Sequence, residues 1–73
     1  MFDIKKFGEY VALMRKSAGM TQTVFAERLC LTRQSISLYE TGECFPDISI
    51  VIQIAEIFDI TIDELVRSGI PDT

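Results

Sequence analysis

Five polar residues near the middle of the chain have side chains suited to the bases and phosphates of a nucleic acid. Arg33 and Gln34 are adjacent, and an arginine can pair bidentately with guanine while a glutamine can pair with adenine. Ser35 and Ser37 add small polar groups beside them. Gln22 opens the helix predicted before them, where free backbone N–H groups favour phosphate. These residue types and spacings predict contacts to DNA, although an ordinary polar helix start would look the same.

Residues for catalysis or metal binding are scarce. Among the 73 residues there is no histidine, which is the commonest general base and the commonest metal ligand. The two cysteines, Cys30 and Cys44, are too few for a structural zinc site with four Cys or His ligands. The adjacent carboxylates of Asp63 and Glu64 are explained by helix capping. We therefore expect no enzyme activity, no catalytic residue, no metal and no cofactor.

The sequence also predicts where the protein works. Its N-terminus lacks the apolar core of a signal peptide, and its apolar runs are too short to cross a membrane. We expect a cytoplasmic protein without a membrane partner. Its cysteines are then expected to be reduced thiols rather than a disulfide.

The net charge of −4 is unevenly distributed along the chain. Residues 1–42 hold six basic and four acidic residues, whereas residues 43–73 hold one basic and seven acidic residues. A surface that binds a polyanion therefore has to lie within the first 42 residues. Two solvated faces that merely differ in charge are the alternative.

The first of five predicted helices spans residues 3–18. Its inward positions are Phe7, Val11, Met14 and Ala18, which recur at steps of four, three and four, as one face of a helix requires. Gly19 follows, where a helix end favours a positive φ.

The second and third helices are short and nearly adjacent. Thr21 is expected to cap a helix over residues 22–29, and Thr32 a helix over residues 33–40 that Gly42 ends. A connection of three residues forces the two helices to cross steeply, which is the geometry of a helix-turn-helix. Such a unit can place its second helix in the major groove of DNA.

Two further helices complete the chain. Asp47 caps a helix over residues 48–58, and Thr61 with Glu64 forms a capping box that opens the last helix over residues 62–68. No alternation with a period of two is present. We therefore predict an all-α fold, a compact five-helix bundle formed by a single domain over residues 1–73.

Several stretches agree in register with the pattern of one known family. They are residues 20–29, 31–37 and 39–42, followed by residues 46–48, 54–58 and 62–65. On these stretches the sequence resembles the Cro/C1-type (Xre-like) helix-turn-helix DNA-binding domains, with a fold of the lambda-repressor-like type. The resemblance implies a sequence-specific transcriptional regulator, repressor-like, with the helix-turn-helix unit at about residues 21–41. It further implies a homodimer on a palindromic operator in double-stranded DNA, with residues 33–40 in the major groove.

The resemblance also implies the residues that contact DNA. Base contacts fall on Arg33, Gln34, Ser37 and Leu38. Phosphate contacts are expected at Gln22, Thr23, Ser35 and Thr41. Leu38 stands where family members often carry a polar or basic residue, so it either contacts a thymine methyl group or weakens the reading of sequence.

Three other positions affect how the predicted helix over residues 33–40 is held. Arg15 and Glu40 match a family pair that fixes the angle of this helix, unless both side chains are simply exposed. Cys30 stands where the family commonly has glycine, so a left-handed backbone there would be strained by about 1 kcal/mol. We expect Cys30 to be a small apolar plug rather than a redox sensor.

Dimerisation is expected through the fourth and fifth helices. The candidates are Ile50, Ile57, Ile62, Leu65 and Val66. A two-fold pair would place the recognition helices about 34 Å apart, one turn of DNA. A wide contact of these helices with the core is the alternative.

A second function remains open at this point. The negative net charge, Leu38 and the apolar fourth helix are also typical of a protein-interaction module that keeps the fold without strong operator reading. An antitoxin-like or antirepressor subunit is such a module.

Overall fold

Every helix of the structure begins at a side chain that accepts hydrogen bonds from free backbone N–H groups. The structure is a computed structural model that describes residues 1–71, and its caps are Asp3, Thr21, Thr32, Asp47 and Thr61. Thr32, for example, accepts a bond from the backbone N–H of Ser35 at 3.2 Å. All four caps that were predicted for the second to fifth helices are confirmed.

These caps open five α-helices within the described residues. The helices are α1 (Ile4–Ser17), α2 (Gln22–Arg28), α3 (Arg33–Thr41), α4 (Ile48–Phe58) and α5 (Ile62–Arg67). Residues 1–71 contain no strand, so the predicted all-α fold of five helices is confirmed. The predicted bounds differ from the observed ones by one residue at the ends of α1, α2, α3 and α5.

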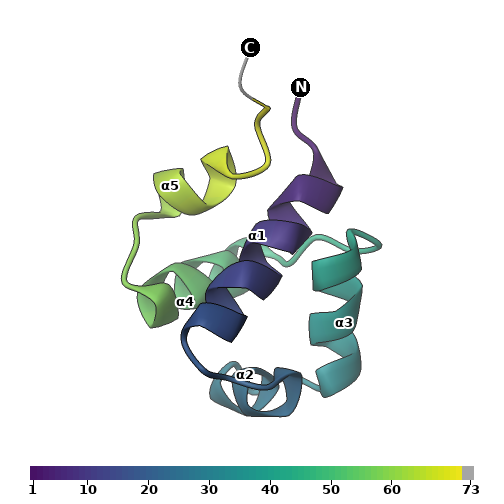
Figure 1. Cartoon of the computed structure of the whole chain (residues 1–73), viewed down its shortest axis with the longest axis vertical. Helices are drawn as coiled ribbons and strands as arrows, with labels where there is room; N and C mark the ends of the chain where they lie inside the picture. Colours follow the sequence, from purple (N-terminus) through teal and green to yellow (C-terminus); the bar gives the residue numbers. More distant parts are fainter. Residues whose placement is uncertain (72–73) are drawn as a thin grey trace.

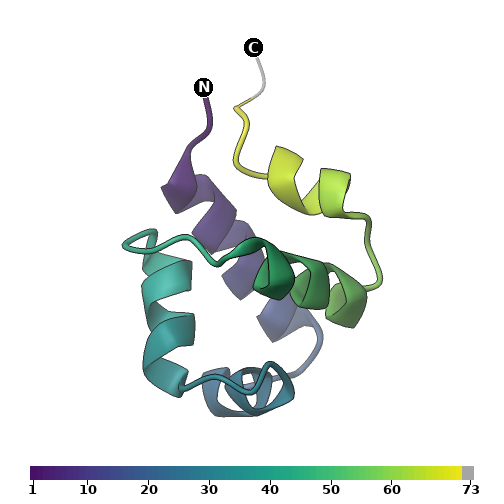
Figure 2. The same cartoon turned by 180° about the vertical axis from the view of Figure 1, so that it is seen from behind.

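The helix α1 passes through the middle of the molecule (Figure 1). α3 and α5 lie on opposite sides of it, and α2 closes the end far from the termini (Figures 1 and 2). Seen from behind, α4 crosses in front of α1 (Figure 2). The two ends of the chain are joined where the backbone N–H of Asp3 donates to the carbonyl of Gly69. α1 is thus the element against which the others are placed.

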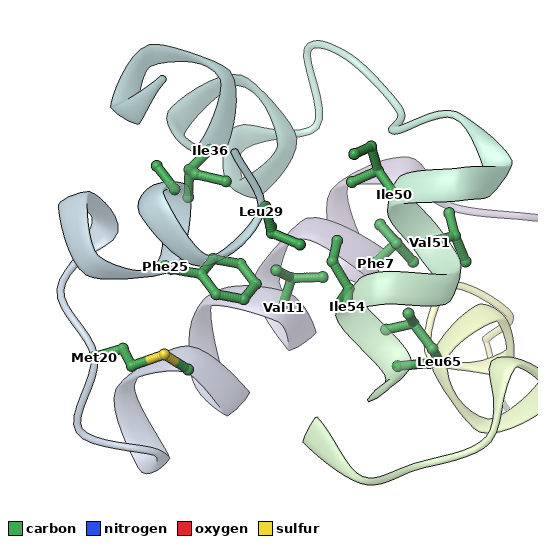
Figure 3. Close-up of a cluster of buried hydrophobic side chains, with 12 residues drawn as sticks. Phe7, Val11, Met20, Phe25, Leu29, Ile36, Ile50, Val51, Ile54 and Leu65 are labelled. Atoms are coloured by element: carbon green, nitrogen blue, oxygen red, sulfur yellow. The ribbon is translucent and has the colours of Figure 1, made fainter. Parts of the chain in front are cut away.

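The core gathers apolar side chains from all five helices (Figure 3). Its fully or nearly buried members are Phe7, Val11, Met20, Phe25, Ala26, Leu29, Ile36, Ile50, Val51, Ile54, Ala55 and Leu65. α4 supplies four of these residues, whereas α3 supplies only Ile36. α3 and α5, with the one buried residue Leu65, therefore each give little of their surface to the core.

Four residues adopt the left-handed backbone at helix ends, namely Gly19, Gly42, Cys30 and Asp59. Gly19 has φ of 75° and Gly42 has φ of 80°, as expected of glycines that end helices. Cys30, in the connection between α2 and α3, has φ of 57°, so the strained conformation considered for it is present. The expectation that Cys30 fills a gap as an apolar plug is wrong, because its side chain is exposed.

One inward position of the first helix was also mispredicted. Ala18 is exposed because α1 ends at Ser17 and Ala18 is its C-cap. The buried residues of α1 are instead Phe7, Gly8, Val11 and Arg15.

Membrane, metal and disulfide features can be decided for residues 1–71. No helix in this range has the length and apolar character to span a membrane. No three His, Cys, Asp or Glu side chains of the described range are grouped so that they could hold a metal ion. Both cysteines are free thiols.

The backbones of α1 and α3 touch at Gly8. A Cβ atom at this position would lie 2.4 Å from the carbonyl oxygen of Tyr39 and 2.6 Å from that of Glu40. Real side chains do not pack at such distances, so only glycine lets α1 approach α3 this closely. This contact sets the spacing between the central helix and the helix that carries the predicted base contacts.

We expect Gly8→Ala to destabilise the protein by about 1–3 kcal/mol, because the added methyl group pushes against backbone that cannot rotate away. Ser17→Ala, which gains the same residue type at an exposed position of α1, should leave stability nearly unchanged. Urea unfolding followed by circular dichroism measures both changes. Equal stability of the two variants would show that the contact at Gly8 is not restrictive.

Candidate nucleic-acid interface

The outward side of α3 carries all four predicted base contacts. Arg33 and Gln34 are exposed at the start of the helix, and Ser37 and Leu38 are partly exposed one turn later. These positions share one face because residues four apart lie above one another in a helix. Ile36 anchors the opposite face and is fully buried. The structure therefore brings the four residues together on an accessible surface.

Tyr39 lies on the inner side of α3, and its hydroxyl group is uncharged. Burial raises the pKa of Tyr39 above its usual value, with smaller contributions from Asp47 and Cys44. The hydroxyl group therefore stays neutral, and the Tyr39 side chain packs against the core without a charge.

The residues predicted to contact phosphate fall into two groups. Gln22 and Thr41 line one open depression between α1 and α3. Thr23 is exposed on α2, and Ser35 is partly exposed on the first turn of α3, where its hydroxyl lies 3.1 Å from that of Thr32. The structure thus brings Gln22 and Thr41 together, whereas Thr23 and Ser35 lie outside the depression.

The helix α1 contributes a cation that the sequence did not single out. Lys16 lines the same depression as Gln22 and Thr41, and its ammonium group is suited to a phosphate. Glu9 also lines the depression, so this surface is not uniformly positive. The excess of basic residues before residue 43 was the only signal for a role of Lys16.

A nearly buried ion pair joins α1 to α3. Arg15 Nε lies 2.6 Å from Glu40 Oε2, and the two side chains are only 9% and 8% exposed. Arg15 Nη2 donates to Glu40 Oε1 at 3.2 Å, and Arg15 Nη1 donates to the carbonyl of Met20 at 2.8 Å. The predicted pair is therefore present, and the alternative in which both side chains are exposed is wrong.

A glutamine extends this pair to the outward face of α3. Gln22 Nε2 donates to Glu40 Oε1 at 3.0 Å. Gln22 Oε1 accepts a bond from Arg33 Nη1, also at 3.0 Å. Four side chains from three helices thus form one hydrogen-bonded chain, which sequence reasoning had seen only as a pair and two separate contacts.

The five candidates for a dimer interface do not share one environment. Ile50 is 8% exposed and Leu65 is fully buried, so both belong to the core and the prediction is wrong for them. The alternative of a core contact holds at these two positions. Ile62 is 41% exposed, and Ile57 and Val66 are partly exposed. Only these three remain available to a partner.

An apolar depression, here called the aromatic pocket, lies next to Val66. Phe2, Ile4 and Phe45 line it together with Val66, and no polar atom contributes to its lining. The rings of Phe2 and Phe45 meet edge to face, with centroids 5.5 Å apart. Sequence reasoning missed this pocket because its residues come from the N-terminus, the α3–α4 connection and α5.

Comparison with known proteins agrees with this geometry. Residues 11–65 match the model of the helix-turn-helix family. The chain belongs to the Cro/C1-type helix-turn-helix family. The predicted family and the lambda-repressor-like fold are thereby confirmed.

Three relatives illustrate the likeness. The chain is 35% identical over 60 residues to the transcriptional activator BcrR of Enterococcus faecalis, covering 82% of this chain and 29% of BcrR. The phage CTXphi transcriptional repressor RstR of Vibrio cholerae is also 35% identical over 60 residues, covering 82% of this chain and 54% of RstR. The restriction-modification controller protein C.AhdI of Aeromonas hydrophila superposes with a TM-score of 0.77 at 26% identity, covering 85% of this chain and 94% of that protein.

The chain spans less than two thirds of the length of the two curated relatives. The helix-turn-helix is therefore the part that is shared with them, and each relative has a further segment that this chain does not match.

We expect Glu40→Ala to destabilise the domain by about 3–5 kcal/mol, because Arg15 would remain buried without its partner. Asp63→Ala removes the acid of the exposed Arg67–Asp63 pair, whose side chains are both 71% exposed, and should cost less than about 1 kcal/mol. Chemical denaturation of the two variants gives the comparison. A loss at Glu40 as small as that at Asp63 would contradict a stabilising role for the buried pair.

Proposed function

We propose that this chain is a DNA-binding transcriptional regulator that places α3 in the major groove of double-stranded DNA. The observation that carries the proposal is that Arg33 and Gln34 are exposed at the start of α3. The opposite side of this helix is anchored by Ile36 and by the Arg15–Glu40 ion pair. An arginine and a glutamine at the start of such a helix suit guanine and adenine. A rigid element presents them in one orientation.

The names of the relatives support this proposal. BcrR is described as a transcriptional activator and RstR as a transcriptional repressor. We propose a repressor-like regulator, because a domain that occupies an operator can block transcription without any further surface. We propose that it acts in the cytoplasm.

The remaining DNA contacts follow from the exposed groups around α3. Ser37 and Leu38 lie next to the bases, and Leu38 contacts a thymine methyl group. The hydroxyl groups of Thr23, Ser35 and Thr41 contact phosphates, as do Gln22 and Lys16 from the depression. These contacts fix the register of the domain on DNA.

The acidic residues support the same orientation. Glu56, Asp63 and Glu64 are exposed on α4 and α5, and α5 lies on the far side of α1 from α3 (Figure 1). When α3 faces DNA, the acidic residues of α5 therefore point away from the phosphates. Few cations remain near the DNA, so the salt dependence of binding should be shallow.

We expect Arg33→Ala together with Gln34→Ala to abolish selective binding without unfolding the domain, because both side chains are exposed. Binding sites would first be selected from a pool of random duplexes, and affinity would then be measured by gel shift. Arg67→Ala, which removes an exposed arginine from α5, is the charge-matched control and should keep the selected affinity.

Retained selectivity in the double variant would contradict the proposed role of α3. A wild-type protein that shifts no duplex at low salt would instead support the second candidate, a protein-interaction module. The fully apolar aromatic pocket is the feature that favours this second candidate.

A second copy of this chain is the partner that we propose for α5. Ile62 and Val66 are four residues apart and form one accessible stripe, and Val66 continues it into the aromatic pocket. A contiguous exposed apolar patch is a common feature of protein contacts. With few cations on each domain, two half-sites read together give the affinity that one lacks. Ile57 lies partly exposed on α4 and extends the same interface.

We expect Ile62→Asp to convert a dimer into a monomer and to weaken operator binding. Ile62 is the first residue of α5, where a negative charge favours the helix, so the fold should tolerate the change. Analytical ultracentrifugation measures the association state. Leu13→Asp places the same charge on an apolar residue of α1 that is 59% exposed and should leave the association state unchanged. A wild-type protein that is monomeric both free and on selected DNA would overturn the proposed dimer.

A further inference from the structure

Thr41 is the last residue of α3 and lies on the side of the helix that is proposed to meet DNA. Gln34, Ser37 and Leu38 precede it by seven, four and three positions, so the four side chains share one face of the helix. Thr41 is exposed and lines the depression between α1 and α3. Its hydroxyl group is therefore the polar group that this end of the face offers to a DNA phosphate.

An acid of the same chain holds this hydroxyl group. Thr41 Oγ1 donates to Glu43 Oε2 at 2.8 Å and lies 3.2 Å from the carbonyl oxygen of Leu38. A hydroxyl group has one proton to donate, and an ionised carboxylate only accepts. The phosphate oxygens of DNA are acceptors as well. Thr41 therefore cannot donate fully to Glu43 and to a DNA phosphate at the same time.

The backbone fixes the position of Glu43 beside Thr41. Gly42 has a left-handed φ of 80°, and the N–H group of Glu43 donates to the carbonyl of Leu38 at 3.0 Å. This pattern folds the chain back over the last turn of a helix. A Cβ atom at Gly42 would lie 2.9 Å from the Cα atom of Lys5, so the turn also packs against the start of α1. Glu43 is thus carried by a turn that is held from two sides.

The charge of Glu43 is not neutralised by an ion pair. Residues 1–71 contain two ion pairs, one between α1 and α3 and one within α5, and Glu43 belongs to neither. Its side chain is exposed. A phosphate that approaches the hydroxyl group of Thr41 therefore meets a competitor for the proton and a like charge at the same place.

We propose that Glu43 is a specificity-determining residue that competes with DNA phosphate for the hydroxyl group of Thr41 and thereby lowers the affinity for duplexes of every sequence. The inference rests on the proposed function, because Thr41 belongs to the same DNA-contacting face. Binding to non-operator DNA consists of phosphate contacts, and such sites are in vast excess in a genome. On an operator, the base contacts of Arg33 and Gln34 offset the cost of displacing Glu43, and elsewhere no base contact does so.

The test is a double-mutant cycle that compares the wild-type protein with Glu43→Ala, Thr41→Val and the variant with both changes. Valine keeps the shape of threonine and removes its hydroxyl group. Affinity is measured by gel shift on the selected operator and on a duplex of random sequence, and circular dichroism checks that each variant is folded. Glu9→Ala is the matched control, because Glu9 is an exposed acid that lines the same depression and lies outside the bond between Thr41 and Glu43.

We expect Glu43→Ala to strengthen binding to both duplexes about tenfold, because DNA no longer has to break a hydrogen bond to a charged acceptor. Glu9→Ala should give a smaller gain, because it removes only a charge. In the Thr41→Val background, the gain from Glu43→Ala should fall to that of Glu9→Ala. Thr41→Ser keeps the hydroxyl group, so the full gain from Glu43→Ala should return in that background.

Three results would overturn the inference and leave the proposed function standing, provided that the wild type selects an operator. They are equal gains for Glu43→Ala and Glu9→Ala, a gain from Glu43→Ala that is unchanged in Thr41→Val, and a gain confined to the selected operator. The first two would leave only a general effect of charge. If no operator is selected but Glu43→Ala binds random duplexes about tenfold more tightly through Thr41, the competition stands and the proposed function fails. Failure of every variant to bind any duplex would overturn both.

Discussion

The ion pair between Arg15 and Glu40 is the interaction on which the placement of α3 depends. α3 contributes to the core one fully buried side chain, Ile36, and the partly buried Tyr39, and the ion pair adds a polar contact that restricts the rotation of the helix about its own axis. A buried pair is stabilising only when its geometry is good and its remaining donors are satisfied. Here the third guanidinium nitrogen of Arg15 donates a hydrogen bond to the carbonyl oxygen of Met20. Together with the backbone contact at Gly8, the pair fixes both the distance and the angle of the helix.

A helix that contacts DNA bases has two conflicting requirements, and this arrangement meets both. A helix of nine residues is not stable alone in water, yet it must keep a broad polar face uncovered to reach DNA. The helix-turn-helix unit resolves the conflict by holding α3 from one side only, through Ile36, Glu40 and the caps at its two ends. The strained left-handed backbone of Cys30 belongs to the same compromise, because the short connection leaves no room for a relaxed turn.

Local signals were read correctly from the sequence, and contacts between distant segments were not. Caps and end glycines act on neighbours within a few residues, so Thr21, Thr32 and Gly42 could be identified from spacing alone. Ile50 and Leu65 were mistaken for interface residues because an apolar stripe looks the same whether it meets the core or a partner. The aromatic pocket and the bond from Gln22 to Glu40 join segments far apart in the chain. No pattern within one sequence predicts such long-range contacts. The contact between Arg15 and Glu40 was predicted only because the sequence resembles a known family.

The charge distribution explains why orientation matters more in this chain than in a strongly basic DNA-binding protein. Attraction to phosphates supplies most of the affinity of basic domains and is indifferent to sequence. A chain with net charge −4 has little of that attraction to draw on, and its acids on α4 and α5 oppose close approach from the wrong side. Affinity must then come from contacts that form only in one pose. Rigid placement of α3 makes that pose favourable, and the dimer that we propose would strengthen it by reading two half-sites at once, an advantage that is lost if α3 can turn.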